Sequence, residues 1–358
     1  MNALTPLRGI AALTVLIFHI TGGRFHGYLA VDLFFILSGF VLMHAYGRIA
    51  LTWPAIMGFL RNRLARIYPV HLVVLVALLP AYGLTSQFSA GGLVSSLLLM
   101  QGPWHVMCWN FFSWSISAEW HAYLVFPFLA VAINRRTNRG LMVLLAVCAL
   151  MVALAFQLHG PGNITNGPEI LRLVLPEFAA GMILYRLYRT AALPAWLATD
   201  AAFIATVGAL VGCGIEGLPD SLCVMLLPVL LLSAARPGSL AARILAIRPL
   251  PYLGEISYSL YMVQIIPQII IEVLLPPLAP ALQDVIFIVG SFALAIPMSR
   301  FVEYPARAWL KEPRGPRAPF RLAASHPRDR VETQRDATRE PMLAFGGQRM
   351  ELPPVRVP

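Results

Sequence analysis

The chain has 358 residues, of which 58% are hydrophobic and 12% charged, and its formal net charge is +10. Because soluble domains carry about 25% charged residues, this composition excludes an ordinary soluble protein and indicates a polytopic membrane protein. The four cysteines lack the spacing of metal ligands or of a disulfide scaffold, so neither a zinc site nor a disulfide-rich fold is expected. Cys213 and Cys223 flank one short connection and could pair, but two small buried thiols are the simpler interpretation.

Ten segments are candidate membrane-spanning helices, which need about 20 mostly apolar residues, so the predicted fold is an all-α transmembrane helical bundle. The start, MNALTPLRG, lacks a basic leader with a cleavage site, and the first segment is therefore expected to be kept as a span. The seventh and eighth segments are short and interrupted by glycine or proline. The ten lie near residues 4–22, 28–47, 68–86, 112–133, 140–158, 169–188, 199–215, 219–235, 254–275 and 282–303.

The arginines between these segments predict the orientation of the bundle. The connections after the third, fifth, seventh and ninth segments contain no Lys or Arg, and the one after the first has only Arg24. The positive-inside rule therefore assigns the other connections and both termini to the cytoplasm, as an even number of spans requires. The arginines in those connections are Arg48, Arg61, Arg63, Arg66, Arg135, Arg136, Arg139, Arg186, Arg189, Arg236, Arg243 and Arg248.

From about Pro305 onward the composition shifts to Arg, Pro, Glu and Asp. Such a segment is too polar to build a core. Residues 1–305 are therefore predicted to form a transmembrane domain, and residues 306–358 a disordered, basic cytoplasmic tail. Since the basic charge follows from topology, no nucleic-acid partner is expected, and the basic residues can rest on anionic membrane lipid.

Ionisable side chains inside the predicted spans are the first candidates for function, because each is costly in hydrocarbon. Arg8 and His19 lie eleven residues apart in the first segment, which is about 16 Å along one face of a helix. Asp32, in the second segment, is expected at the depth of His19, where a hydrogen bond to the imidazole would fix its tautomer and raise its basicity. Glu119 and His121, in the fourth segment, are expected at a similar level.

Structural roles are the alternative for each of these groups. Asp32 and Glu119 could accept hydrogen bonds from backbone or Trp N–H groups. A lone membrane histidine is as often a satisfied packing residue as a functional one, and we expect packing roles for His44 and His71.

The stretch FLRNRLARIYPVH contains Arg61, Arg63 and Arg66 just before the third segment. Guanidinium groups bind phosphate through paired hydrogen bonds, so the cluster is a candidate site for a polyanionic cytoplasmic donor such as a coenzyme A thioester. Anchoring of the span by arginines that reach lipid phosphates is the alternative.

Seven stretches in order, over residues 4 to about 310, resemble the integral-membrane acyltransferase 3 family. They are LRGIAALTVLIFH, VDLFFILSGF, FLRNRLARIYPVH, WSISAEWHAYL, LPEFAAGMIL, YLGEISYSLYM and VEYPAR. Members of this family O-acylate bacterial surface polysaccharides such as exopolysaccharide, lipopolysaccharide O-antigens, Nod factors and some small molecules.

The resemblance implies a multi-pass transferase of the bacterial inner membrane. Its expected donor is cytoplasmic acyl-CoA, most often acetyl-CoA, and its expected acceptor is a hydroxyl of a polysaccharide, glycolipid or similar molecule, often presented from outside. The family's arginine–histidine pair falls on Arg8 and His19, its RxxR element on Arg63 and Arg66, and its membrane glutamate on Glu119. No metal is expected.

The hypothesis that follows assigns a role to each group. Arg63 and Arg66, with Arg61, hold the donor phosphates, and Arg8 lies at the mouth of the cavity. His19, oriented by Asp32, is a general base or a transient acyl acceptor. Glu119 binds the acceptor hydroxyl or assists proton movement.

Two departures and two competing hypotheses accompany the resemblance. Many relatives have histidine where this chain has Gln264, which cannot act as a base near neutral pH, and the C-terminal segment is too short and charged for the SGNH hydrolase-like domain of larger relatives. A non-enzymatic transporter or flippase is the main alternative, because spans with buried His, Asp and Glu also suit a proton-coupled carrier. A structural scaffold for polysaccharide assembly is the other.

Overall fold

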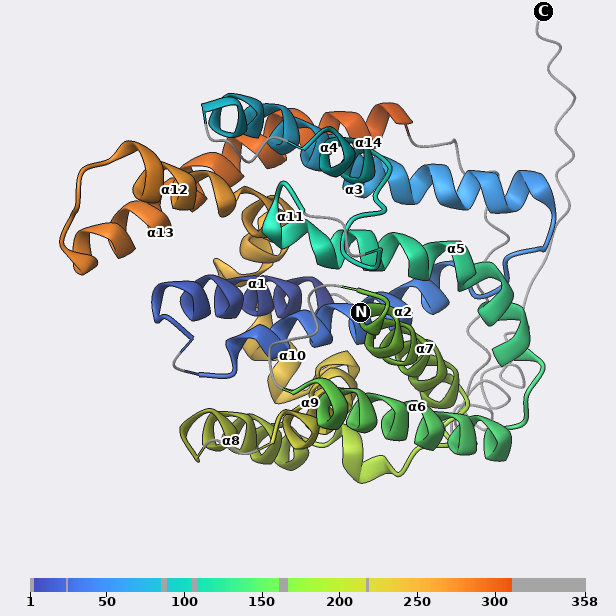
Figure 1. Ribbon diagram of the computed structural model, residues 1–358. Coiled ribbons are helices and arrows are strands. Elements are labelled where there is room, and N and C mark those ends of the chain that lie inside the picture. Colours follow the sequence, from blue (N-terminus) through green and yellow to red (C-terminus); the bar gives the residue numbers. More distant parts are fainter. Residues whose placement is uncertain are drawn as a thin grey trace, which may run out of the picture. The chain divides into compact units, whose positions relative to one another are not determined.

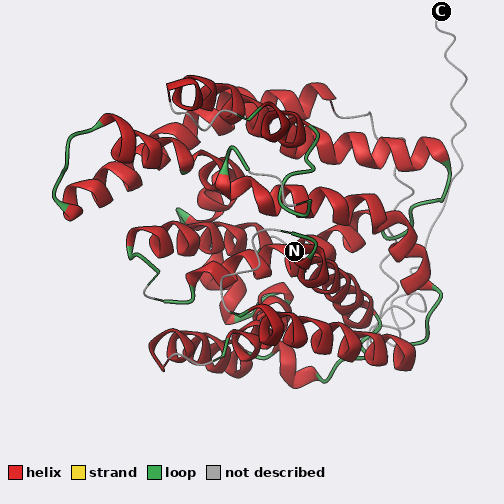
Figure 2. Cartoon of the chain, in the orientation of Figure 1, coloured by secondary structure: helices red, strands yellow, loops and turns green. Residues whose placement is uncertain are grey.

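The computed structural model describes residues 3–23, 25–84, 89–104, 108–160, 167–216 and 219–310. Every regular element in these ranges is helical (Figure 2). A helix satisfies its own backbone hydrogen bonds, which an apolar segment needs in a bilayer. The all-α prediction is therefore confirmed.

The helices of the described ranges are joined mostly by short connections. The α-helices are α1 (Leu4–Ile20), α2 (Ala30–Tyr46), α3 (Trp53–Leu84), α4 (Ala90–Leu97), α5 (Trp114–Asn134), α6 (Asn138–His159), α7 (Glu169–Arg189), α8 (Asp200–Glu216), α9 (Asp220–Ala235), α10 (Leu240–Leu245), α11 (Leu250–Val263), α12 (Ile265–Ile269), α13 (Pro280–Pro297) and α14 (Tyr304–Leu310). Short 3₁₀ turns are η1 (Gly27–Leu29), η2 (Phe111–Ser113) and η3 (Ala195–Ala198), and π-helical turns are η4 (Ile270–Leu274) and η5 (Met298–Glu303).

Each of the ten predicted spans overlaps at least one of these helices, but not all of the helices are long and apolar enough to cross a bilayer. Among the described residues six stretches qualify by length and composition, and three further apolar helices are shorter. Helix α7 is long enough but carries charges at Glu169, Arg172, Glu177, Arg186 and Arg189. The structure supports a membrane protein with six candidate spanning helices, and the count of ten stays a prediction. The six are Gly27–Tyr46, Trp53–Ala81, Phe111–Asn134, Asn138–His159, Leu250–Val273 and Pro280–Leu310.

Helix α3 differs from its prediction, because it begins at Trp53 and carries the arginine stretch inside a helix of 32 residues. Arg63 and Arg66 are three residues apart and therefore share a helix face, whereas Arg61 and Arg63 are two apart and point in different directions. The helical register thus divides the cluster.

Two close helix pairs hold the centre of the bundle. Helix α2 packs against α7, where a Cβ atom at Gly181 would lie 1.9 Å from the Ile36 carbonyl oxygen. Helix α1 packs against α11, where a Cβ atom at Gly9 would lie 2.5 Å from the Gly254 backbone nitrogen. Small residues let membrane helices approach this closely. In Figure 1 the pair α1 and α2 lies between α11, α3 and α5 on one side and α7 and α9 on the other.

The last described helix, α14, runs to Leu310, past the predicted domain boundary at residue 305. The rest of the predicted tail, residues 311–358, lies outside the described residues. The four cysteines are free thiols, with Cys213 and Cys223 both buried, in agreement with the simpler interpretation of that pair.

Candidate active site

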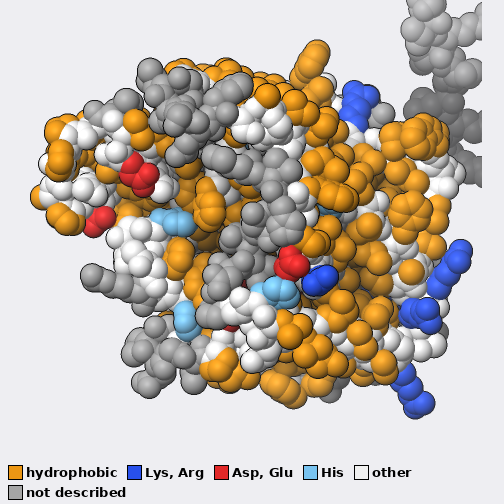
Figure 3. All heavy atoms as spheres, in the orientation of Figure 1, with side chains coloured by type: hydrophobic (Ala, Val, Ile, Leu, Met, Phe, Trp, Pro, Cys, Tyr) orange, Lys and Arg blue, Asp and Glu red, His pale blue; other side chains and the backbone are white. Residues whose placement is uncertain are grey.

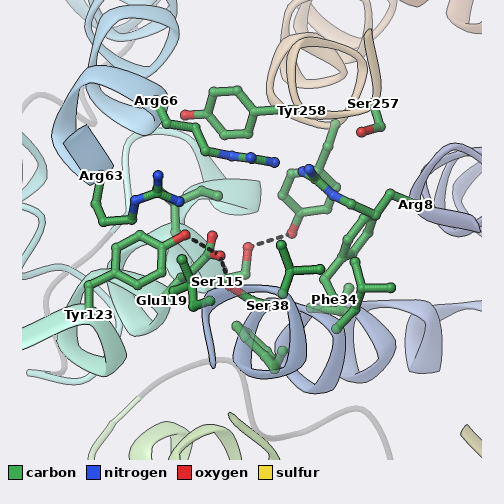
Figure 4. Close-up of a pocket in the computed structure, with 17 residues that line it drawn as sticks. Arg8, Phe34, Ser38, Arg63, Arg66, Ser115, Glu119, Tyr123, Ser257 and Tyr258 are labelled. Carbon is green, nitrogen blue, oxygen red and sulfur yellow. Dashed lines mark hydrogen bonds between the residues drawn. The ribbon is translucent and has the colours of Figure 1, made fainter. Parts of the chain in front are cut away.

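Helices α1, α2, α3, α5 and α11 enclose a cavity of about 80 Å³, here called the arginine cavity (Figure 4). Three of its lining side chains are arginines, Arg8 from α1 and Arg63 and Arg66 from α3. In Figure 4 the guanidinium groups of Arg8 and Arg66 approach from opposite sides, with Arg63 beside them. Glu119, from α5, lines the same space.

Glu119 is held in place by two hydroxyl groups. Ser38 Oγ on α2 donates a hydrogen bond to Glu119 Oε1 at 2.7 Å, and the Tyr123 hydroxyl, one turn along α5, donates to the same oxygen. A carboxylate that accepts two hydrogen bonds in a partly buried site is fixed in one orientation. Its second oxygen, Oε2, takes part in neither of these bonds.

The three arginines of this cavity form no ion pair with a described carboxylate. Arg63 lies over the ring of Tyr46, 5.2 Å from the centroid, and its buried Nε atom has no hydrogen-bond partner among the described residues. The nearby Glu303, on η5, instead pairs with Arg307 at 3.2 Å and accepts a hydrogen bond from Ser259. Three guanidinium groups beside one carboxylate leave an excess of positive charge, which suits an anionic ligand.

Arg61 does not line the arginine cavity. Its Nε atom donates to the Leu310 carbonyl oxygen at 2.9 Å, in an exposed position. The expectation that Arg61 joins Arg63 and Arg66 is therefore not met, because a step of two residues turns its side chain to another face of α3.

His19 and Asp32 line a second cavity of about 330 Å³, the histidine cavity. The His19 ring packs edge-on against Phe112, with ring centroids 4.8 Å apart. No hydrogen bond joins His19 to Asp32, which corrects the expectation that Asp32 fixes the imidazole tautomer. Asp32 lies on the face of α2 that packs against α7, and its carboxyl adjoins that of Glu177.

The two cavities are neighbours, since Val31 and Tyr261 line both of them. Tyr261 is held by a hydrogen bond from Ser115 Oγ at 2.9 Å. Glu119 and His19 were expected in one polar zone. The structure instead gives each its own cavity, separated by the Val31 and Tyr261 side chains.

The sequence of the protein matches a family model over most of its length. Residues 1–300 match Acyl_transf_3, described as an acyltransferase domain. The chain belongs to the acyltransferase 3 family. It is therefore a membrane acyltransferase, within the transferase class of enzymes.

The chain is similar in sequence to two curated proteins. It is 36% identical over 152 residues to acyltransferase MdmB of Streptomyces mycarofaciens, an alignment that covers 36% of this chain and 38% of that protein. It is 34% identical over 180 residues to "Protein 2 in picA locus" of Rhizobium radiobacter. That alignment covers 42% of this chain and 92% of that protein. No solved structure matches.

Several residues in or near these cavities were not singled out from the sequence. Ser38, Tyr123 and Tyr261 read as ordinary helix residues, and only their contacts across helices distinguish them. Glu177 and Glu303 lie in the LPEFAAGMIL and VEYPAR stretches, so a charge inside an apolar motif was the available signal.

Other histidines have structural partners. His71 Nε2 bonds the Ser96 carbonyl oxygen at 2.8 Å, and His44 Nδ1 bonds the Tyr185 hydroxyl at 2.9 Å, as expected for packing residues. Among the described residues no group of three His, Cys, Asp or Glu side chains is arranged to hold a metal ion.

Proposed function

We propose that the protein transfers an acyl group, normally acetyl, from acyl-CoA to a hydroxyl of a polysaccharide, lipid-linked glycan or similar acceptor. The reaction would take place in a bacterial inner membrane, with the donor on the cytoplasmic side. Family membership supports acyl transfer. The observation that supports the donor class is the set of three guanidinium groups that line one cavity beside Glu119 and form no ion pair with a carboxylate in the described part of the chain.

Arg8, Arg63 and Arg66 form the donor site in this proposal. Coenzyme A is a polyanion, and its phosphates are attracted by a concentrated positive charge. The cavity of about 80 Å³ is small. At about 10–15 Å³ for each water, it has room for only a few water molecules. It therefore suits the slender thioester arm, with the phosphates nearer to its mouth.

His19 is the proposed base. As the acceptor hydroxyl oxygen attacks the thioester carbonyl carbon, the hydroxyl proton moves to the imidazole, the C–S bond breaks, and the imidazolium returns the proton to the departing thiolate. Such catalysis contributes about 10²- to 10⁴-fold. Asp32, in the same cavity, would stabilise the imidazolium through its charge. In a covalent variant of this mechanism, His19 carries the acyl group between the two half-reactions.

Glu119 has a supporting role in this mechanism. Because Ser38 and Tyr123 hold one of its oxygens, the other can accept a hydrogen bond or a proton from a group that enters the arginine cavity. The acyl end of the donor, still bonded to the thioester sulfur, would extend past Val31 and Tyr261 to reach His19.

Transfer of label from radioactive acetyl-CoA tests the proposal, in membranes from a strain that keeps its native surface glycans. We expect His19→Ala to lower the label incorporated by about 10²-fold or more, and Arg66→Ala to raise the KM for acetyl-CoA at least about tenfold, equivalent to 1.4 kcal/mol. Arg61→Ala and His44→Ala are matched controls, because neither side chain lines the two cavities. Immunoblots check membrane insertion.

Two outcomes would reject the proposal. Equal label in every variant would remove His19 and Arg66 from the reaction. Neither transfer nor hydrolysis of any acyl-CoA by the wild type would favour the carrier hypothesis instead.

A further inference from the structure

A third cavity, of about 180 Å³, opens on the other side of His19 and is here called the vestibule. The His19 side chain lines both the histidine cavity and the vestibule. The other polar residues that line the vestibule are Gln268 on α12, Glu272 on η4, and Gln283 and Asp284 at the start of α13. One imidazole therefore faces two spaces, and the arginine cavity adjoins only the first of them.

The polar groups of the vestibule present mainly hydrogen-bond acceptors. Gln268 Nε2 donates to Glu272 Oε1 at 3.0 Å, and Gln283 Nε2 donates to the Leu278 carbonyl oxygen at 2.9 Å. One N–H of each amide is engaged in these bonds and one is left, whereas both amide oxygens and the carboxylates of Glu272 and Asp284 can accept hydrogen bonds from a ligand, so acceptors outnumber donors. A molecule with several O–H or N–H donors matches this set.

The charge of the vestibule is opposite to that of the arginine cavity. Two carboxylates line it, and none of its described lining residues is Lys or Arg. Figure 3 shows acidic side chains and a histidine on the face near α12 and α13, whereas most of the visible Lys and Arg side chains gather at the opposite end. Such a field repels anions and attracts cations, so a ligand of the vestibule differs in class from coenzyme A.

The size of the vestibule also points to an organic ligand. A single water needs about 10–15 Å³, so the vestibule has room for a ring with its substituents. Phe287, buried on α13, supplies an apolar wall. Carboxylates, amides and an aromatic wall around one cavity form a surface that can bind both the hydroxyl groups and the C–H face of a sugar.

We infer that the vestibule is the acceptor site, and that it takes a neutral or amino-bearing polyhydroxylated molecule in preference to an anionic one. This inference rests on the proposed function for the role of His19. The ligand hydroxyl that reaches His19 gives up its proton there and forms the new ester bond. Glu272 and Asp284 bind the rest of the molecule and do not react.

Binding of three oligosaccharide probes to the purified protein tests the site without requiring turnover. The probes are a glucose oligomer, a glucosamine oligomer and a galacturonate oligomer, followed by saturation-transfer NMR in lipid nanodiscs. We expect the glucosamine oligomer to bind at least about tenfold more tightly than the galacturonate oligomer, a ratio that corresponds to 1.4 kcal/mol. Asp284→Lys should reverse this preference. Tightest binding of the galacturonate oligomer, or no binding of any probe, would overturn the inference.

Variants then locate the binding. Asp284→Asn and Gln283→Ala should each weaken glucosamine-oligomer binding by about fivefold or more, within the range of one lost hydrogen bond to a charged or polar group. Glu255→Gln is the control, because Glu255 is an exposed carboxylate that lines none of the three cavities. Equal effects of Glu255→Gln and Asp284→Asn would reject the site.

Transfer assays separate the two proposals. Asp284→Asn should raise the KM for the acceptor glycan and leave the KM for acetyl-CoA unchanged. If the wild type binds the probes as expected but neither transfers nor hydrolyses the acyl group, the proposed function fails and the binding site stands. If transfer depends on His19 but Asp284→Asn alters only the KM for acetyl-CoA, the acceptor-site inference fails.

Discussion

Glu177 shows how a single residue can matter without lying in a cavity wall. Its side chain is 1% exposed, and neither carboxyl oxygen accepts a hydrogen bond from the described residues. The adjoining Asp32 is also buried. Two carboxyl groups side by side in an apolar site do not readily both stay ionised. We therefore predict that the pair shares one proton and keeps one negative charge, with one carboxyl donating to the other.

Glu177→Ala and Glu177→Gln separate the role of this pair from that of packing alone. The alanine variant leaves the buried Asp32 carboxyl without its partner, which costs about 1–3 kcal/mol. The glutamine variant keeps a hydrogen-bond donor, so its free energy of unfolding should lie within about 1 kcal/mol of the wild-type value. Thermal unfolding of the purified protein in one detergent measures both. Equal stability of the two variants would contradict the shared-proton pair.

Helix α7 sets the position of Asp32 at the scale of the element. It packs along α2 through Gly39 and Gly181, each of which faces a carbonyl oxygen of the other helix at a distance that admits no side chain. This close contact turns the Asp32 face of α2 toward α7 and brings Asp32 to Glu177. The orientation of Asp32 is therefore a consequence of helix packing.

Gly181→Ala should destabilise the protein, because the added Cβ atom would lie 1.9 Å from the Ile36 carbonyl oxygen. Overpacking of this kind costs about 1–3 kcal/mol, occasionally more. Gly208→Ala on α8 is the matched control, since nothing lies within 4 Å of a Cβ atom there. A higher helix propensity makes Gly208→Ala neutral or stabilising, by up to about 1 kcal/mol. The yield and melting temperature of both variants provide the measurement, and equal losses would contradict the close-packing argument.

At the scale of the whole molecule, the arginine cavity, the histidine cavity and the vestibule follow one another. Shared residues connect them, Val31 and Tyr261 between the first two and His19 between the last two. A donor that binds by its negative charge and an acceptor that binds through its hydroxyl groups would thus approach His19 from different cavities. This separation suits transfer between substrates that lie on opposite sides of a membrane.

Labelling of introduced cysteines tests the orientation that this separation requires. The positive-inside rule predicts that the connection after α5 is cytoplasmic and that the one before α13 is external. Ala279→Cys should react with a membrane-impermeant maleimide in intact cells with a permeabilised outer envelope. Arg136→Cys should react only after the inner membrane is opened. Reaction of both positions under the same condition would contradict an odd number of crossings between them.

The sequence by itself determined the helical class, the membrane character and the family, because hydropathy and motif spacing are properties of local segments. A helix in lipid needs no partner to satisfy its backbone, so each apolar stretch could be assigned alone. Arg8, Arg63, Arg66 and Glu119 could be chosen as candidates for a similar reason. A charge in an apolar segment is visible without the fold.

Only the tertiary structure decided which of these groups meet. Each residue turns a helix by about 100°, so the contacts of a side chain depend on how its helix is rotated against its neighbours. That rotation places Arg63 in the arginine cavity and Arg61 outside it, and it turns Asp32 toward Glu177 instead of bonding it to His19. The vestibule joins α1 to residues on α12, η4 and α13, about 250 positions away along the chain. No local pattern records a contact over that separation, because the packing of the intervening helices creates it.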